Sequence, residues 1–419
     1  MRTVFVFSLI LLFNISNAKS QWQYYYEFPE LGFINDIKIV SNSIVFVGRY
    51  NHLDKSVDFG KNWSVVLNTS EIEAMDFLDI EFLDETHGFV AKRGTYDTGS
   101  CLYTENGGVT WDEIFPGFGD YPPTTNNICI AAPGHIYLTA GEGVYDGKVF
   151  YTHDNFVHLE SVRPAPFNFD QQVADIDCIN VDTCIAIHGT PYCCDGGTEK
   201  GMYKTVNGGE DWELKRQFFD GIDIEFTSSN VLYAFNFEYI VKSMDQGETW
   251  DSLKKHVPGG YFTTMKFLND SVGYLAEWMY PENKIYFTQD GGETWIENTI
   301  DSMPAGKITA IDCWNVDSCF FGSSRKLYRN FSETVSIIET GSSNVIQFTI
   351  RPNPASEILF LQLKNSGNEM EILSYNLVGE IVDLYFVNNQ ADVSHLPPGI
   401  YFTEVITEQG RAVQKWVKM

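Results

Sequence analysis

The chain has 419 residues, a formal net charge of −28 and an aromatic content of 15%. Its length allows two or three domains, and its 34 glycines among many aromatic residues indicate short strands joined by tight turns. The negative charge repels phosphate backbones and argues against nucleic acid as a partner. Beyond the N-terminus, no apolar stretch approaches the roughly 18 residues of a membrane-spanning helix, so we expect no transmembrane segment.

Residues 1–18 have the features of a signal peptide. Arg2 supplies the initial positive charge, an apolar run extends from Val4 to Phe13, and Ser16 and Ala18 are the small residues that a signal peptidase reads. We expect cleavage after Ala18, and the sequence therefore predicts export.

An eight-residue motif then recurs: Ser or Thr, any residue, Asp or Asn, any residue, Gly, any residue, often Thr, and Trp. Its clear copies are Ser56–Trp63, Thr104–Trp111, Thr205–Trp212, Ser243–Trp250 and Thr288–Trp295, and a decayed copy that keeps only the first half is Thr152–Leu159. Successive copies start 48, 48, 53, 38 and 45 residues apart, close to the length of one four-stranded propeller blade.

The residue types of this motif have structural reasons. An acid or amide at the third position starts a tight turn, glycine at the fifth supplies a positive φ, and the first hydroxyl bonds the turn backbone. The tryptophan begins the next strand and buries a large ring between sheets. We therefore expect structural roles for the third and eighth residues of the clear copies: Asp58, Trp63, Asn106, Trp111, Asn207, Trp212, Asp245, Trp250, Asp290 and Trp295.

Eight cysteines in an exported chain indicate disulfides. Two cysteine pairs share one local frame, in Asp177–Cys184 and Asp312–Cys319, and this frame aligns with the hairpin Phe82–Ala91. The ends of such a hairpin face each other at about 4.5–5.5 Å, so we predict the disulfides Cys178–Cys184 and Cys313–Cys319.

The other four cysteines have no such frame. Cys129 aligns with the first cysteine of the pairs, but His135 stands where its partner would lie. The pairing of Cys129 with Cys101, Cys193 or Cys194 stays open, because three pairings of four cysteines are possible.

The hairpin and turn repeats together predict an all-β fold with seven blades, beginning near residues 33, 78, 126, 173, 221, 262 and 308. The last blade lacks a clear turn motif and is identified by its Cys313 frame. Its outermost strand is either the N-terminal segment Trp22–Phe28, which would close the ring, or the competing segment Val335–Glu339.

These repeats resemble the BNR/Asp-box family, and the blade pattern is similar to that of the photosystem II stability/assembly factor-like seven-bladed propellers. The resemblance covers about residues 22–340 and implies a propeller domain over residues 19–340. It implies little about function, because Asp boxes occur in sialidases, other glycosidases and sortilin-type receptors.

A change of composition at Thr340–Asn344 marks a linker to a second domain, residues 346–419. Alternating apolar residues at Ile358–Leu363, Met370–Asn376 and Tyr401–Ile406 predict a small antiparallel, Ig-like β-sandwich.

The segment also carries Pro352-Asn353-Pro354, a central strand ending near Gly379, the turn Leu396–Tyr401 and a basic final strand. These features resemble the type IX secretion C-terminal sorting domain. The resemblance implies type IX-like secretion machinery as a partner, and a location in the medium or on the outer cell surface after passage through the periplasm.

No catalytic motif accompanies the repeats. The six arginines of the propeller include no Arg-Ile-Pro sequence, which disfavours a sialidase, and no His-Glu-x-x-His, Gly-x-Ser-x-Gly or phosphate loop occurs. We expect no metal or cofactor. The favoured hypothesis is a binding or adhesion module for an extracellular glycan or protein; the alternatives are an extracellular glycoside hydrolase acting on polysaccharide and a structural or assembly partner.

Candidate ligand-binding residues come from the loops after the second strand of each blade, which gather on one face of a propeller. These loops are rich in aromatic and charged residues that could hold a sugar or a peptide. The candidates are Arg49, Tyr50, Arg93, Tyr96, Tyr145, His188, Glu277, Trp278 and Tyr280.

Overall fold

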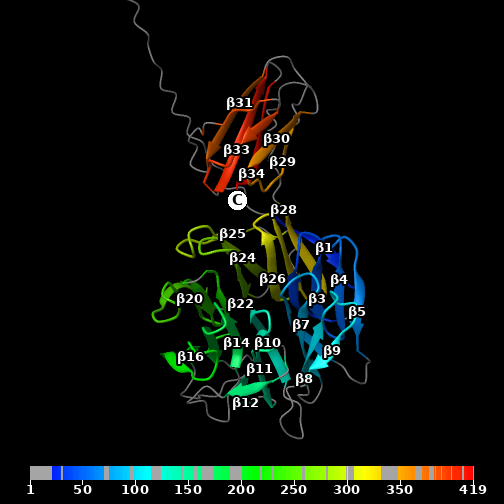
Figure 1. Ribbon diagram of the computed structural model, residues 1–419, viewed down its shortest axis with the longest axis vertical. Helices are drawn as coiled ribbons and strands as arrows, with labels where there is room; N and C mark the ends of the chain where they lie inside the picture. Colours follow the sequence, from blue (N-terminus) through cyan, green and yellow to red (C-terminus); the bar gives the residue numbers. More distant parts are fainter. Residues whose placement is uncertain are drawn as a thin grey trace, which may run out of the picture. The chain divides into compact units, whose positions relative to one another are not determined.

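Seven four-stranded antiparallel sheets follow one another along the described part of the propeller in this computed structural model (Figure 1). The chain divides into two units, the propeller Lys19–Phe331 and a unit that contains the C-terminal domain from Ser332 onward. The structure describes residues 21–418 except 30–31, 70–74, 95–98, 115–123, 143–144, 155, 157, 163–172, 189–200, 218, 229, 257–259, 280–281, 299, 301–305, 332–347, 364–369, 377–381, 383, 388, 398 and 408–409.

Each of the first six sheets consists of four consecutive strands, with the first strand innermost, and we number these sheets as blades 1 to 6. Blades 1 to 3 comprise β2 (Ile34–Ile39), β3 (Val45–Arg49), β4 (His52–Ser56), β5 (Ser64–Asn68); β6 (Met75–Phe82), β7 (Gly88–Gly94), β8 (Gly99–Thr104), β9 (Asp112–Ile114); and β10 (Thr124–Ala132), β11 (His135–Glu142), β12 (Tyr145–Thr152), β13 (Glu160–Val162). Blades 4 to 6 comprise β14 (Val173–Cys178), β15 (Cys184–His188), β16 (Gly201–Thr205), β17 (Glu213–Gln217); β18 (Asp223–Phe226), β19 (Leu232–Phe235), β20 (Tyr239–Ser243), β21 (Asp251–Lys255); and β22 (Gly260–Phe267), β23 (Gly273–Met279), β24 (Glu282–Thr288), β25 (Ile296–Asn298).

Blade 7 is closed by the N-terminal strand. It contains β26 (Ile308–Asn315), β27 (Ser318–Ser323) and β28 (Lys326–Phe331), and β1 (Gln21–Glu27) pairs antiparallel with β28. Trp22 is fully buried there, with its ring 5.5 Å from that of Tyr274 and 5.0 Å from that of Phe321. The first of the two expected closures is therefore the observed one, and Val335–Glu339 lies outside the described residues.

The repeated turns have the geometry that their residue types predict. In the turn after β16, the Gly209 N–H donates to Thr205 Oγ1 at 3.0 Å, and the Asp211 N–H donates to Asn207 Oδ1 at 3.0 Å. Gly209 has a φ of 96°, which a residue with a Cβ rarely adopts. The Trp212 indole N–H donates to the Gly209 carbonyl at 3.0 Å and so ties the start of the fourth strand to the turn.

The copy that looks decayed in sequence still forms this turn. The Phe156 N–H donates to Thr152 Oγ1 at 2.9 Å, and the His158 N–H donates to Asp154 Oδ1 at 2.8 Å. Phe156 takes a φ of 65° at the glycine position. Because the hydroxyl and the carboxylate make the turn bonds, the turn survives the loss of its glycine and tryptophan.

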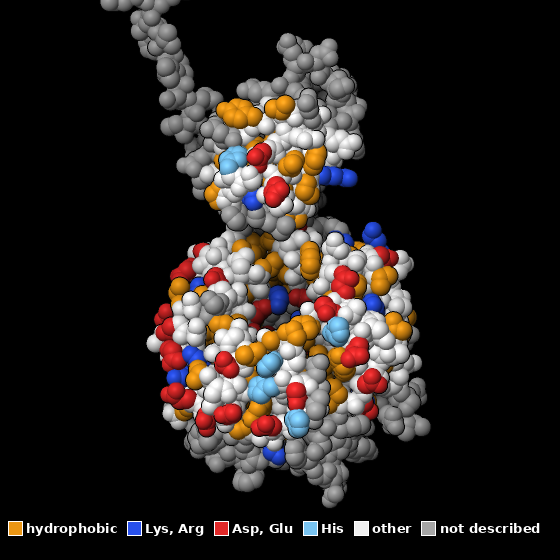
Figure 2. Space-filling model, viewed as in Figure 1, with side chains coloured by type: hydrophobic (Ala, Val, Ile, Leu, Met, Phe, Trp, Pro, Cys, Tyr) orange, Lys and Arg blue, Asp and Glu red, His pale blue; other side chains and the backbone are white. Residues whose placement is uncertain are grey.

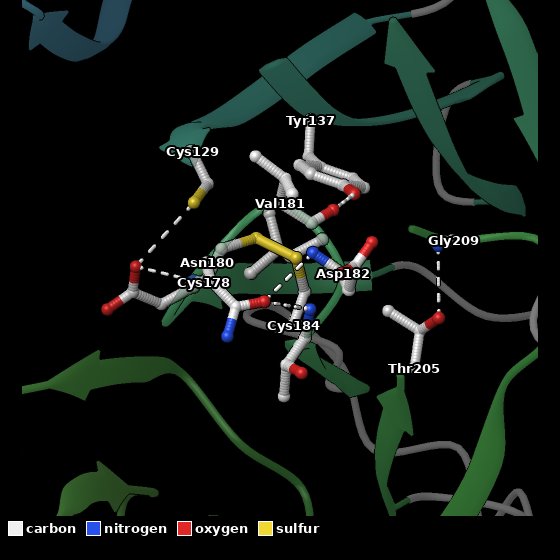
Figure 3. Close-up of a disulfide and its surroundings, with 12 residues drawn as sticks. Cys129, Tyr137, Cys178, Asn180, Val181, Asp182, Cys184, Thr205 and Gly209 are labelled. Carbon is white, nitrogen blue, oxygen red and sulfur yellow. Dashed lines mark hydrogen bonds between the residues drawn. A yellow bond between two sulfur atoms is a disulfide. The ribbon is translucent and has the colours of Figure 1, made fainter. Parts of the chain in front are cut away.

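Both predicted disulfides are present. Cys178 and Cys184 lie directly opposite each other on β14 and β15 with a Cα–Cα distance of 4.0 Å (Figure 3). Cys313 and Cys319 repeat this arrangement in blade 7. Within the first hairpin, Asn180 Oδ1 accepts hydrogen bonds from the backbone N–H groups of Asp182 and Thr183, both at 2.9 Å. Cys101 and Cys129 are buried free thiols, and Cys193 and Cys194 lie outside the described residues.

The C-terminal unit is a sandwich of two three-stranded sheets. One contains β29 (Phe348–Arg351), β30 (Ile358–Leu363) and β32 (Gln390–Asp392), and the other contains β31 (Met370–Asn376), β33 (Gly399–Thr407) and β34 (Gly410–Lys418). Trp416 is fully buried in its core, stacks on Tyr401 at 4.9 Å and donates its indole N–H to Thr403 Oγ1. None of the described residues of either unit forms a helix that could cross a membrane.

Candidate functional site: the central channel and the upper face

The propeller has two distinct ends. We call the end at which the innermost strands begin the upper face, and the end that carries the repeated turns the lower face. A cavity of about 420 Å³ is lined by the innermost strands of all seven blades, and Figure 2 shows this hollow with acidic and basic side chains inside it.

Six carboxyl groups and one amide in this channel link one blade to the next. A side chain on one innermost strand accepts a hydrogen bond from a backbone N–H on the following one. The contacts are Asp36 to Ile80 (2.8 Å), Asp79 to Ile128 (2.6 Å), Asn127 to Ile176 (3.4 Å), Asp175 to Ile224 (2.7 Å), Asp177 to Phe226 (2.7 Å), Glu225 to Phe267 (2.8 Å) and Asp312 to Ile39 (2.6 Å).

A register shift in the innermost strands precedes many of these acids. In blades 1, 2 and 4 the shift lies between Ile34 and Asp36, between Phe77 and Asp79, and between Val173 and Asp175. An extra residue in a strand bends it and changes the direction of the next side chain. On a regular strand, residues two positions apart face the same side. The bulge therefore explains how the acid can line the channel although the residue two positions before it is buried and apolar.

Burial raises the pKa of several channel acids. The pKa of Asp36 rises to about 7, mainly because burial disfavours the charged form, while Lys38 opposes the rise and Glu81 adds to it. The pKa of Asp223 also rises to about 7, through burial and the charge of Glu225. Burial likewise raises the pKa of Asp177, two residues after Asp175 on β14, to about 6.

Two lysines partly neutralise the channel. Lys38 Nζ lies 2.5 Å from Glu81, and Lys266 Nζ lies 2.5 Å from Glu225 and 3.9 Å from Asp312. Burial alone would lower the pKa of Lys266, but Glu225 and Asp312 hold it above its ordinary value. Lys266 also joins blades 6 and 7, the junction at which the described residues show no side-chain-to-backbone bond of the kind above.

Three of the predicted site residues lie inside the propeller. Arg49 is 0% exposed, donates from Nε to Asp54 Oδ2 at 2.7 Å and lies over the Phe28 ring at 4.5 Å. His188, at the end of β15, is also 0% exposed. Glu277 is fully buried and accepts a hydrogen bond from the Tyr286 hydroxyl at 2.7 Å.

These placements correct the expectation that all three residues belong to the exposed loops. They are buried at or near the ends of their strands, where the second strand still packs against its neighbours. We therefore leave them out of the candidate ligand surface.

The other predicted residues divide into two groups. Tyr50 is 41% exposed at the upper face, Arg93 lies 3.6 Å from Asp76, and Trp278 is half-buried near the end of β23. Tyr96 and Tyr280 lie outside the described residues, as does the side chain of Tyr145.

Three consecutive blades converge on Tyr261 at the upper face. The Tyr261 ring lies 5.2 Å from the Trp278 ring of its own blade and 5.5 Å from the Phe237 ring of blade 5. Lys307 Nζ, just before the first strand of blade 7, lies 4.8 Å from the Tyr261 ring centroid. We call Phe237, Tyr261, Trp278 and Lys307 the Tyr261 cluster.

Sequence reasoning found only Trp278 of this cluster. The candidates were sought in loops after second strands, but Tyr261 and Lys307 stand at the starts of first strands. The sequence did contain a signal for Tyr261. It is an aromatic residue at the start of a first strand, and it pairs in the sheet with Trp278, an aromatic residue near the end of the second strand.

Solved structures with the propeller fold resemble this chain. YCF48 bound to D1 peptide shares 18% identity with a TM-score of 0.56, over 74% of this chain and 96% of that one. The extracellular domain of the putative hybrid two component system BT4673 from B. thetaiotaomicron shares 9% (TM-score 0.56; 93% of this chain, 51% of that one). The Niastella koreensis GH74 enzyme shares 11% (TM-score 0.55; 92% and 66%).

At these identities the likeness establishes the fold alone. No curated protein matches the sequence of the chain. Residues 349–419 match the family described as the secretion system C-terminal sorting domain. The chain is therefore a β-propeller that carries a type IX C-terminal sorting domain, and it is exported to the cell surface or the medium.

Proposed function

We propose that the chain is an exported binding module whose propeller holds an extracellular glycan or protein at its upper face. The observation that carries this proposal is the convergence of Phe237, Tyr261 and Lys307, from three consecutive blades, on one aromatic cluster beside Trp278. Aromatic rings with one polar or charged neighbour are common in sites that bind a sugar or a peptide.

The engagement of the channel acids favours binding over glycoside hydrolysis. A hydrolase needs one carboxylic acid and one carboxylate free to act on either side of a glycosidic bond. In this channel Asp36, Asp175 and Asp312 accept backbone N–H groups of the neighbouring blades, which is a structural role. A peptide ligand stays within the proposal, since the structural neighbour YCF48 is bound to D1 peptide.

We further propose that residues 1–18 are a cleaved signal peptide, that residues 19–340 and 346–419 are the two domains, and that the repeated turns are Asp boxes. N-terminal sequencing of the secreted protein should begin at Lys19. Deletion of residues 346–419 should keep the propeller in the periplasm, and release of the truncated chain to the medium would contradict the sorting role.

A glycan and peptide array probed with the full-length secreted chain tests the binding function. We expect a restricted set of ligands, and the same array probed with Trp278→Ala should lose them. Hydrolysis assays on each bound glycan then separate binding from catalysis, because cleavage products would support the hydrolase instead. A chain that binds nothing on either array contradicts the proposal.

A further inference from the structure

The Tyr261 cluster combines aromatic rings with a lysine. Some lysines of the propeller form ion pairs, such as Lys38 with Glu81, Lys204 with Glu248 and Lys284 with Glu297, whereas others lie over an aromatic ring. Lys307 is exposed and lies over Tyr261, and it forms no ion pair with any carboxylate among the described residues. On a chain of net charge −28, this leaves an ammonium group beside an aromatic surface and open to an anion.

The rest of the neighbourhood is polar and partly basic. Lys255 ends β21 opposite Tyr239, and the His256 N–H donates to the carbonyl of Glu238 at 2.9 Å, so both residues border the loop that carries Phe237. Glu238 is the exposed acid of this loop. Among the described residues, Lys255, His256 and Glu238 thus border the loop that carries Phe237, and the Glu277 carboxyl group lies beside Gly260, next to Tyr261.

The distribution of exposed apolar residues argues against an apolar peptide as the ligand. A groove for such a peptide needs aliphatic as well as aromatic walls. Among the described residues of the propeller, the exposed large aliphatic side chains lie in turns of the lower face or on the outer strand β5: Val57, Val65, Leu83, Val109, Val206 and Met244. Phe237, 38% exposed, has aromatic and charged neighbours instead.

We propose that the Tyr261 cluster binds a hexuronate residue of an acidic polysaccharide, an inference that rests on the proposed binding function. The C–H face of the sugar stacks on the Trp278 ring, beside Tyr261, and the sugar carboxylate pairs with Lys307, which lies over Tyr261. The rings supply contact area that any pyranose can use, and the lysine supplies the preference for a carboxylate.

The net charge of the chain decides which probe to use. A long polyuronate is repelled by the acidic surface, but at about 0.15 M salt charges more than about 8 Å away are largely screened. At this salt concentration, the affinity for the short oligosaccharide trigalacturonate therefore depends mainly on its contacts with the Tyr261 cluster. Its fully methyl-esterified form is the matched neutral ligand, because esterification removes the charges of the carboxylates and adds only one methyl group to each.

The test is calorimetric titration of the full-length chain with both trisaccharides. Trigalacturonate should bind about three- to tenfold more tightly than its methyl ester, as expected for one partly exposed ion pair. Lys307→Gln should abolish this preference and leave the affinity for the ester unchanged. Lys326→Gln is the matched control, since Lys326 Nζ also lies over a tyrosine ring, that of Tyr24 at 5.8 Å, in the outer part of blade 7.

The outcomes separate this inference from the binding function. Equal affinity for the two trisaccharides, with loss of both in Trp278→Ala, would overturn the uronate preference and keep the binding site. Trigalacturonate binding that Trp278→Ala leaves unchanged would place the site elsewhere and overturn both. If the chain binds ligands on the arrays, such as peptides, but neither trisaccharide, the uronate inference alone would be overturned. Thermal unfolding of each variant checks that the fold is retained.

Discussion

Asp312 Oδ2 accepts a hydrogen bond from the backbone N–H of Ile39 at 2.6 Å, across 273 positions of sequence. Asp312 stands on the first strand of blade 7 and Ile39 on the first strand of blade 1, so this contact closes the ring on the channel side. On the outer side, pairing of β1 with β28 closes the same blade. Residues from the two ends of the propeller domain thus close the ring both at the channel and at the outer strands.

Removal of the Asp312 carboxylate should weaken this closure. Asp312 also accepts the Cys313 N–H at 2.9 Å, so Asp312→Ala leaves two buried N–H groups without their acceptor. We expect a loss of about 2–4 kcal/mol in the free energy of unfolding, measured by urea denaturation. Asp312→Asn, which retains one acceptor oxygen, should cost less, and equal stability of the alanine variant and the native chain would contradict the role in closure.

The channel acids predict that stability falls as pH rises through neutrality. The pKa values of Asp36 and Asp223 in the folded state, about 7, lie above the ordinary value of 3.8, so the folded chain binds more protons than the unfolded chain between these values. The free energy of unfolding should therefore decrease by up to about 1.4 kcal/mol per pH unit for each such group, until the pH passes the folded pKa.

Urea midpoints at pH 5 and pH 8 measure this dependence. The double variant Asp36→Asn/Asp223→Asn removes both titrating groups and keeps an oxygen acceptor at Ile80, so its stability should change less between the two pH values. A native chain that is more stable at pH 8 than at pH 5 would contradict the assigned protonation.

The disulfide of the β14–β15 hairpin should contribute modest stability. The bond links residues only six positions apart, so it restricts a short loop of the unfolded chain. We expect Cys178→Ser/Cys184→Ser to lose about 2 kcal/mol by the chain-entropy account, with secretion retained. Thermal unfolding without reductant should show this difference between the native chain and the double variant. Reductant should narrow the difference, because it breaks Cys178–Cys184 in the native chain and Cys313–Cys319 in both.

The two buried free thiols should resist modification. Burial raises the pKa of Cys101 and, with the nearby Asp177 carboxylate, that of Cys129 as well, so little reactive thiolate forms at neutral pH. A maleimide followed by peptide mapping should label neither residue in the native chain and both after denaturation. Rapid labelling of Cys129 in the native chain would contradict its burial beside Asp177, 3.6 Å away (Figure 3).

Local features of the fold could be predicted from sequence, and features that depend on ring closure could not. Thr205 and Gly209 act within one turn, and Cys178 and Cys184 within one hairpin, so their neighbours in sequence determine their contacts. Asp36 and Asp312 look like isolated acids in sequence. Their shared role appears only when seven sheets surround one axis.

The candidate site could be predicted only in part for the same reason. Trp278 belongs to a loop-bearing strand end and was found, but Lys307 approaches Tyr261 from the next blade and depends on how the blades pack. Arg49, His188 and Glu277 were expected in loops, but their side chains point into the blades. Sequence periodicity locates a strand end more reliably than it gives the direction of the last side chain.

The central claim is that the propeller binds its ligand at the Tyr261 cluster, and a comparison of two tryptophan variants tests it most directly. Trp278 belongs to the cluster, whereas Trp314 is 48% exposed near the end of β26 at the lower face and serves as the matched control. We predict that Trp278→Ala raises the dissociation constant for the ligand identified on the arrays by about tenfold or more. Trp314→Ala should leave this dissociation constant unchanged. Retained affinity in Trp278→Ala, or loss of affinity in Trp314→Ala, would contradict the account.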